Sequence, residues 1–165
     1  MLDIRKMSAA DLPAVLAIQA TCYPQATHES RESLLAKLGA SPATCLIASL
    51  DGEPVGYLIA LPGLRSRPPE LNALTCSAPP SASCLHLHDL AVTPRARAAG
   101  TGRALVAAFL SLLKRSRLDR ASLVAVQNSA PFWERHGFRA VSASPSLQAT
   151  LSTYGAGVQY MECAR

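Results

Sequence analysis

The chain has 165 residues, a length that suits one domain with its own hydrophobic core, and no repeat or Gly/Ser-rich linker divides it. We therefore expect a single domain over residues 1–165. Although 49% of the residues are apolar, the apolar runs are short and broken by charges or proline, which argues against a membrane span of about 20 residues. The N-terminal segment MLDIRKMSAADL lacks the apolar region of a signal peptide, so the sequence predicts a cytoplasmic protein.

The net charge is +5, and arginines carry most of the positive charge. They form no long run interleaved with aromatic residues, which argues against nucleic-acid binding and leaves a polyphosphate ligand open. The five cysteines are odd in number and lack C-x-x-C spacing, so zinc or thioredoxin-like chemistry is not indicated. We expect them to be small buried apolar side chains: Cys22, Cys45, Cys76, Cys84 and Cys163.

In the first half of the chain, residues 2–5 alternate as a strand does, and Ser8-x-x-Asp11 predicts a capping box at the start of a helix that runs to residue 21. A second helix is expected over Glu29–Leu38, stopped by Gly39. Asp51-Gly52 predicts a hairpin between strands at residues 44–50 and 54–61. A long irregular loop, residues 62–81, should follow, and loops of that length are often functional.

The second half alternates strands and helices. The expected elements are strands at 84–92, 121–126, 138–142 and 158–163, a helix at 100–115 and a short helix at 129–136. With the first half, this order predicts an α/β (α+β) fold, a mixed sheet with helices on both faces.

The most informative segment is residues 85–114, in which a strand enters a glycine-containing loop that opens directly into a helix. Gly100 and Gly102 remove side chains that would keep an anion from the free N–H groups of the first turn, and Arg97 and Arg103 add positive charge. This arrangement suits a pyrophosphate. A plain tight turn remains an alternative, whereas a dinucleotide fold is disfavoured because G-x-G-x-x-G is absent.

The segment R-A-A-G-T-G at 97–102 resembles the R/Q-x-x-G-x-G/A signature of the GCN5-related N-acetyltransferase (GNAT) family. An L-A-V-x-P strand end at 90–94 precedes it and E-R-H-G-F at 134–138 follows, as in that family. The resemblance implies a mostly antiparallel sheet of six to seven strands and acetyl-CoA as cofactor. It implies that the backbone of Leu90, Ala91 and Val92 pairs with the pantetheine. Pyrophosphate would be bound around Arg97, Ala98, Ala99, Gly100, Thr101, Gly102 and Arg103. Asn128 matches a pantetheine-binding position, although the spacing from Asn128 to Trp133 is shorter than usual.

Acetyl transfer to an amine requires a group that removes the amine proton, and histidine is well suited to this near neutral pH. His86 and His88 are two residues apart on the predicted strand, so both should face the same side, near the thioester. They are candidates for a proton relay, with a pocket-shaping role as the alternative. Asp89 should face the opposite way unless a bulge interrupts the strand, and is the second candidate base. The string HLHDLAV also resembles the serotonin (arylalkylamine) N-acetyltransferase branch, which carries such a histidine pair.

The family's usual general acid, a tyrosine four residues before the Gly-Phe, is replaced here by Trp133. Trp133 should line the cofactor or acceptor site, or else pack in the core. Tyr154 is the first candidate for the missing acid, with Tyr23 as an alternative. The backbone N–H near Leu90 is the expected oxyanion donor, and no metal is needed.

The sequence thus predicts an acetyl-CoA-dependent N-acetyltransferase acting on a small primary amine, with a homodimer as a further expectation from the resemblance. The long loop favours a covered acceptor site over an open peptide groove. A protein N-terminal or lysine acetyltransferase, and a non-catalytic acyl-CoA-binding module, remain alternatives.

Overall fold

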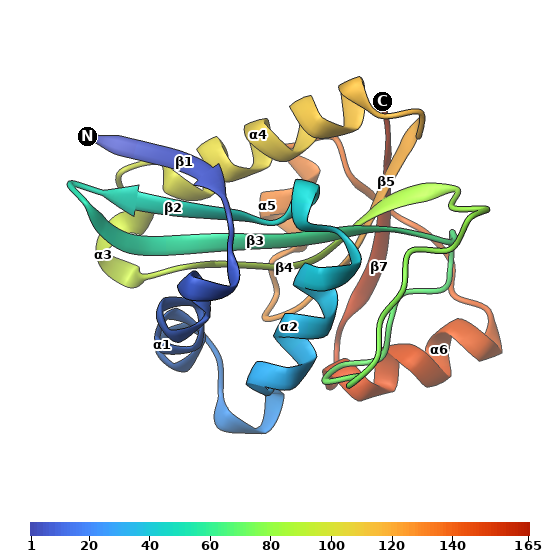
Figure 1. The fold of residues 1–165 in the computed structure, drawn as a ribbon. Helices are drawn as coiled ribbons and strands as arrows, with labels where there is room; N and C mark the ends of the chain where they lie inside the picture. Colours follow the sequence, from blue (N-terminus) through green and yellow to red (C-terminus); the bar gives the residue numbers. More distant parts are fainter.

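A seven-stranded sheet forms the centre of the computed structural model, which describes residues 1–165, and its strand order is β1-β2-β3-β4-β5-β7-β6. All neighbouring strands are antiparallel except β4 and β5 (Figure 1). The strands are β1 (Leu2–Lys6), β2 (Leu46–Leu50), β3 (Glu53–Gly63), β4 (Cys84–Val92), β5 (Arg120–Ala125), β6 (Arg139–Ala140) and β7 (Gln159–Ala164). The predicted mixed, mostly antiparallel sheet is confirmed.

Helices cover both faces of this sheet (Figure 1). They are α1 (Leu12–Cys22), α2 (Arg31–Ala40), α3 (Pro94–Arg97), α4 (Thr101–Arg115), α5 (Ala130–Glu134) and α6 (Pro145–Leu151). The larger core lies between the sheet and α4, where Phe109 and Leu105 are fully buried. A second core, around Val15 and Leu34, joins α1 and α2 to the opposite face. None of the helices has both the length and the apolar character needed to cross a membrane.

Two local signals in the first half act as expected. The backbone N–H of Ser8 donates to Asp11 Oδ2 at 2.8 Å, as in a capping box. Asp51 and Gly52 both have positive φ, 52° and 86°, as the tight turn of a β-hairpin requires.

The predicted bounds of the second helix are wrong at both ends. The helix α2 begins at Arg31, because Ser30 caps it by accepting the N–H of Ser33 at 3.1 Å. Glu29 therefore precedes the helix. Gly39 lies inside the last turn, and the helix ends before Ser41, which adopts an extended φ of −152° next to Pro42.

The C-terminal third holds one helix that the prediction lacks. Helix α6 starts at Pro145 behind Ser144, whose side chain accepts the N–H of Leu147, so the usual start signals were present in the sequence. The predicted strand at 138–142 is shorter, with β6 spanning only Arg139–Ala140. The cysteines are free; Cys45 and Cys84 are buried as expected and the other three only partly so.

Candidate active site

A gap opens in the sheet between β4 and β5. The two strands pair only where Leu85–Leu87 meets Ala121–Leu123. Beyond Leu87 the strands diverge, so the backbone of residues 88–92 has no partner on the β5 side. Two cavities of about 380 Å³ and about 970 Å³ lie along this gap. Their walls share Tyr23, Leu90, Gln127 and Phe132, so the two cavities adjoin in the gap. We call the two cavities together the passage, with one end at α4 and the other at α1 and α2.

The larger cavity lies at the N-terminus of α4. Its wall combines the end of β4 with the glycine loop: Ala91, Val92, Arg97, Ala98, Ala99, Gly100, Gly102 and Arg103. Gly100 precedes the helix in a left-handed conformation, φ 77°, which glycine adopts without the steric cost of a side chain. Free N–H groups of a 15-residue helix and two arginines make this cavity suitable for a polyphosphate. Thr101 is fully buried and does not line it.

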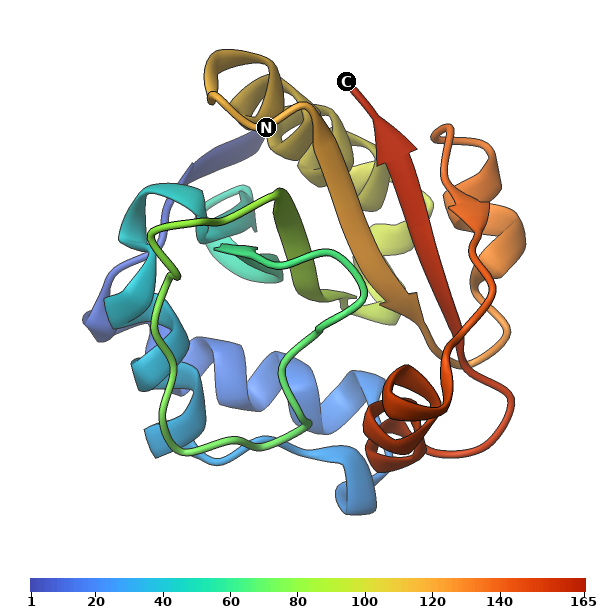
Figure 2. The ribbon, with the colours of Figure 1, turned by 90° about the vertical axis from the view of Figure 1, so that its right-hand side faces the viewer.

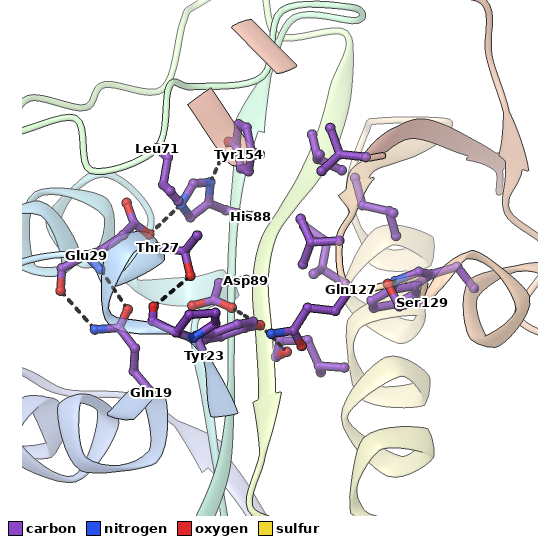
Figure 3. Close-up of a pocket in the computed structure, with 18 of the residues that line it drawn as sticks. Gln19, Tyr23, Thr27, Glu29, Leu71, His88, Asp89, Gln127, Ser129 and Tyr154 are labelled. Atoms are coloured by element: carbon purple, nitrogen blue, oxygen red, sulfur yellow. Dashed lines mark hydrogen bonds and ion pairs between the residues drawn. The ribbon is translucent and has the colours of Figure 1, made fainter. Parts of the chain in front are cut away.

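A β-bulge at His88 sets the chemistry of the smaller cavity. On β3, the consecutive residues Ile59 and Ala60 pair with Asp89 and Leu87, so His88 is an extra residue on β4. The bulge reverses the side-chain alternation after His88. His88 and Asp89 therefore both line the smaller cavity (Figure 3), whereas a regular strand would have sent Asp89 to the α4 face.

The His88 ring is buried between the Glu29 carboxylate and the Tyr154 hydroxyl (Figure 3). Its Nε2 lies 2.6 Å from Glu29 Oε1, and its Nδ1 lies 3.5 Å from the Tyr154 hydroxyl. Glu29 was not among the predicted site residues. It lies 59 positions from His88 in sequence, in a segment predicted to be the start of a helix, and carries no motif that would mark it.

Glu29 is a buried carboxylate with a second buried partner. Its Oε2 accepts from Lys37 Nζ at 2.8 Å, and neither side chain is more than 2% exposed. Burial alone would raise the pKa of Glu29, but His88 and Lys37 outweigh that effect and lower the pKa well below its usual value. The carboxyl is therefore ionised at neutral pH.

Asp89 is bound by two phenols. The hydroxyl of Tyr23 donates to Oδ1 at 2.7 Å and that of Tyr57 donates to Oδ2 at 2.6 Å. Burial raises the pKa of Asp89, although both phenols favour the ionised form. Asp89 is thus a stronger base than an exposed aspartate, and each oxygen keeps a free lone pair on the cavity wall.

His86 is on the same face as His88, as predicted, with ring centroids 6.2 Å apart. It lines neither cavity. Its Nδ1 lies 2.9 Å from the Ser122 hydroxyl, and its Nε2 is buried without a partner. Burial, and to a lesser degree His88, lowers the pKa of His86 to about 3, so the ring is neutral at physiological pH.

Two aromatic side chains complete the smaller cavity. Tyr154, in a one-turn 3-10 helix, is buried and donates to the carbonyl of Pro69. Burial raises the pKa of its phenol, so the hydroxyl stays protonated. Trp133 lines the cavity and also packs edge-on against Phe138 in the core, so both roles considered for it are present.

Asn128, which the resemblance implies is a pantetheine-binding residue, lies beside the two cavities but not in their walls. It is exposed and has a φ of 55°. Its neighbour Gln127, also in a left-handed conformation, lines both cavities and donates to the Cys22 carbonyl at 3.3 Å. The two left-handed residues turn the chain sharply after β5.

The parallel pair of β4 and β5 splays apart beside the glycine-capped N-terminus of α4. The sequence matches the model of the acetyltransferase (GNAT) family over residues 12–138. The chain therefore belongs to the GNAT family; it is an acyltransferase, and acetyl-CoA is its cofactor. No curated protein sequence matches it at a significant level.

Solved structures with the same fold include enzymes of different activity. The GphF GNAT-like decarboxylase in complex with isobutyryl-CoA has a TM-score of 0.81 at 19% identity, with 98% of each chain covered. The PaiA N-acetyltransferase from Thermoplasma acidophilum in complex with coenzyme A has 0.69 at 19% identity, covering 100% of this chain and 99% of that one. The ribosomal-protein-S18-alanine N-acetyltransferase from Escherichia coli has 0.68 at 17%, covering 99% and 94%.

Proposed function

We propose that this enzyme acetylates the primary amine of a small molecule that occupies the cavity of about 380 Å³. The observation that carries the proposal is the passage in the gap between β4 and β5. The proposed polyphosphate-binding end lies on the α4 face, and the smaller cavity, lined by His88 and Asp89, lies at the other end. The volume is in the range of small-molecule sites.

The loop between β3 and β4 favours a small acceptor over a peptide. Figure 2 shows it running past α2 and α6. Leu71 lines that cavity, and its N–H donates to Thr153 Oγ1 at 3.3 Å, while Pro69 accepts from Tyr154. These bonds fasten the loop across the acceptor end, which narrows the opening through which a peptide would have to pass.

The lining of the cavity favours an apolar amine without a carboxylate. No lysine or arginine lines it, so the carboxylate of an amino acid would have no counter-charge. Asp89 on the wall would instead attract an ammonium group. The apolar lining consists of Leu71, Leu87, Leu90, Leu123, Val124, Val126 and Val158, together with aromatic residues. An arylalkylamine or alkylamine fits this chemistry, which is also the branch that the HLHDLAV string resembles.

The cofactor supplies the acetyl group as a thioester. The backbone of Leu90 to Val92, free on the β5 side, would pair with the pantetheine, and N–H groups around Gly100 would bind the pyrophosphate beside Arg97 and Arg103. The backbone N–H near Leu90 would donate to the oxyanion that forms during transfer.

His88 is the proposed base. Its Nδ1 would accept the amine proton, while Glu29 on Nε2 balances the charge of the imidazolium. Asp89, on the same wall, is the second candidate base. Tyr154 is the proposed acid, since its phenol stays protonated and lies 3.5 Å from His88 Nδ1. His86 is assigned an indirect role, because it is behind the cavity wall.

The test is thiol release from acetyl-CoA with a panel of acceptors: arylalkylamines, alkylamines, amino acids, and peptides with free N-termini or lysines. We expect turnover with the amines that lack a carboxylate and little with the others. Preference for peptides would contradict the small-molecule proposal.

A parallel reaction with malonyl-CoA measures loss of carbon dioxide, because a structure with the same fold is described as a GNAT-like decarboxylase. Decarboxylation without acetylation of any amine would overturn the proposed function. Tight acetyl-CoA binding without turnover in either assay would indicate a non-catalytic acyl-CoA-binding module.

A further inference from the structure

Glu29 is held through both its backbone and its side chain. Its backbone is clamped by Gln19, whose Nε2 donates to the Glu29 carbonyl and whose Oε1 accepts the Glu29 N–H, both at 2.9 Å. Gln19 is itself 3% exposed. The backbone of Glu29 is therefore fixed by a buried residue and not by a flexible surface side chain.

Two groups donate hydrogen bonds to Glu29 Oε2. Lys37 Nζ donates at 2.8 Å and the backbone N–H of Asn72 donates at 2.9 Å. The Ser33 hydroxyl has one proton, and the Ala73 carbonyl at 2.7 Å is a nearer acceptor for it than Glu29 Oε2 at 3.1 Å. Ser33 Oγ in turn accepts from Lys37 at 2.8 Å. Lys37 is wholly buried and has no other anion within reach, so its charge keeps Glu29 in the carboxylate form.

The remaining oxygen determines the state of His88. An ionised carboxylate can only accept, so the 2.6 Å contact places a proton on His88 Nε2. In the neutral ring, Nδ1 is then the unprotonated nitrogen, and it is the one on the side of Tyr154. The other titratable groups facing this ring are Asp89, His86 and Tyr154, with Lys37 behind Glu29.

We propose that Glu29 is a positioning residue that fixes the Nε2–H tautomer of His88, and that Lys37 maintains the negative charge this requires. The proposal deepens the proposed function and rests on it for its kinetic part. When the acceptor's N–C bond forms and the C–S bond of the thioester breaks, the amine proton moves to His88 Nδ1. The imidazolium is balanced by Glu29, and the thiolate leaves with a proton from Tyr154 or solvent.

The test removes both charges of the ion pair together. Glu29→Gln alone leaves Lys37 buried without an anion, which would destabilise the fold. The variant Glu29→Gln/Lys37→Met avoids that. We expect its kcat to fall on the order of 10²–10⁴-fold, as in catalytic triads that lose the carboxylate behind the histidine. The affinity for coenzyme A should stay within about twofold of the wild type, because Glu29 and Lys37 lie outside the larger cavity. The pH profile of kcat/KM should also change, because the ring loses the carboxylate that contacts its Nε2.

Glu162→Gln is the matched control. Glu162 is also a buried carboxylate, 6% exposed, but its partner is Arg65 and it lines neither cavity. Its rate and pH profile should equal those of the wild type. If the folded double variant keeps the wild-type kcat and pH profile, Glu29 is a structural residue only and the proposal is wrong.

A second measurement does not depend on turnover. The ¹⁵N NMR spectrum of the ring in the wild type should show the neutral form of His88 protonated on Nε2, and the double variant should lose this preference. A wild-type ring protonated on Nδ1 would overturn the proposal even if amines are acetylated. An Nε2–H ring in a protein that acetylates no amine would support the positioning role of Glu29 and overturn only the proposed function.

Discussion

The two ends of the passage are built in different ways. The proposed pyrophosphate end is made mainly of backbone, with glycine and arginine residues that are neighbours in sequence. The acceptor end is made of buried side chains that come from distant parts of the chain, with Glu29, His88 and Tyr154 as its centre. The cofactor end should therefore respond to changes of backbone conformation, and the acceptor end to loss of single functional groups.

The largest expected effect is on the acceptor end. His88→Gln should lower kcat on the order of 10²–10⁴-fold, because the amide cannot take up a proton. The affinity for coenzyme A, measured by calorimetry, should stay the same. His86→Gln is the matched variant, since His86 lines neither cavity, and should cost far less. A larger loss in His86→Gln would mean that the inner histidine, not His88, takes the proton.

Tyr154→Phe should lower kcat roughly 10²-fold, because it removes the proposed donor to the thiolate. It also removes the bond to Pro69, which should cost about 1 kcal/mol of stability. Tyr160→Phe is the control, since Tyr160 accepts the N–H of Ser66 on the same loop without lining the cavity. Equal kcat losses in the two variants would assign Tyr154 to loop anchoring alone.

At the cofactor end, Gly100→Val should raise the Kd for coenzyme A roughly 10- to 100-fold, equivalent to about 1.4–2.7 kcal/mol. No atom lies within 4 Å of the added Cβ, but the left-handed φ of 77° strains a branched residue, and the side chain stands where the anion approaches. Gly39→Ala, inside α2 with open space around it, is the control and should leave the Kd unchanged. Unaltered affinity in Gly100→Val would place the pyrophosphate elsewhere.

The stability of the fold should depend on pH through the buried His86 ring. The folded-state pKa of His86 is about 3, below the ordinary 6.5. Between these values the unfolded chain binds a proton that the folded chain does not. The free energy of unfolding should therefore fall as the pH drops from 6.5 towards 3, by up to about 1.4 kcal/mol per pH unit. Denaturant unfolding at several pH values measures this dependence. The free energy of unfolding should fall less steeply with decreasing pH in His86→Gln than in the wild type. The same slope in both would mean that His86 is protonated in the folded chain.

The sequence was most informative where structure depends on near neighbours. The Asp51-Gly52 hairpin, the strand Cys84–Val92 and the glycine-capped α4 were all predictable, because turn residues, alternation and helix caps act within a few positions. The family model over residues 12–138 agrees with the resemblance drawn from the same segment.

Sequence reasoning did not find Glu29 because nothing local marks it. Its role depends on contacts with Gln19, Lys37 and His88, which only the fold brings together. The resemblance implies that Asn128 contacts the cofactor, whereas Gln127 is the residue of this turn that lines the two cavities. One residue of difference in a tight turn is below what spacing can resolve.

Because of the bulge at His88, the side chains that face the smaller cavity depend on the register of β4. Deleting this one residue would leave the neighbouring residue types unchanged, yet it would turn Asp89 from two phenols toward the apolar core under α4. A graft of this site onto another sheet must therefore copy a backbone irregularity along with the side chains. In this enzyme, one extra residue in β4 decides whether the Asp89 carboxylate faces the smaller cavity or would be buried without polar partners.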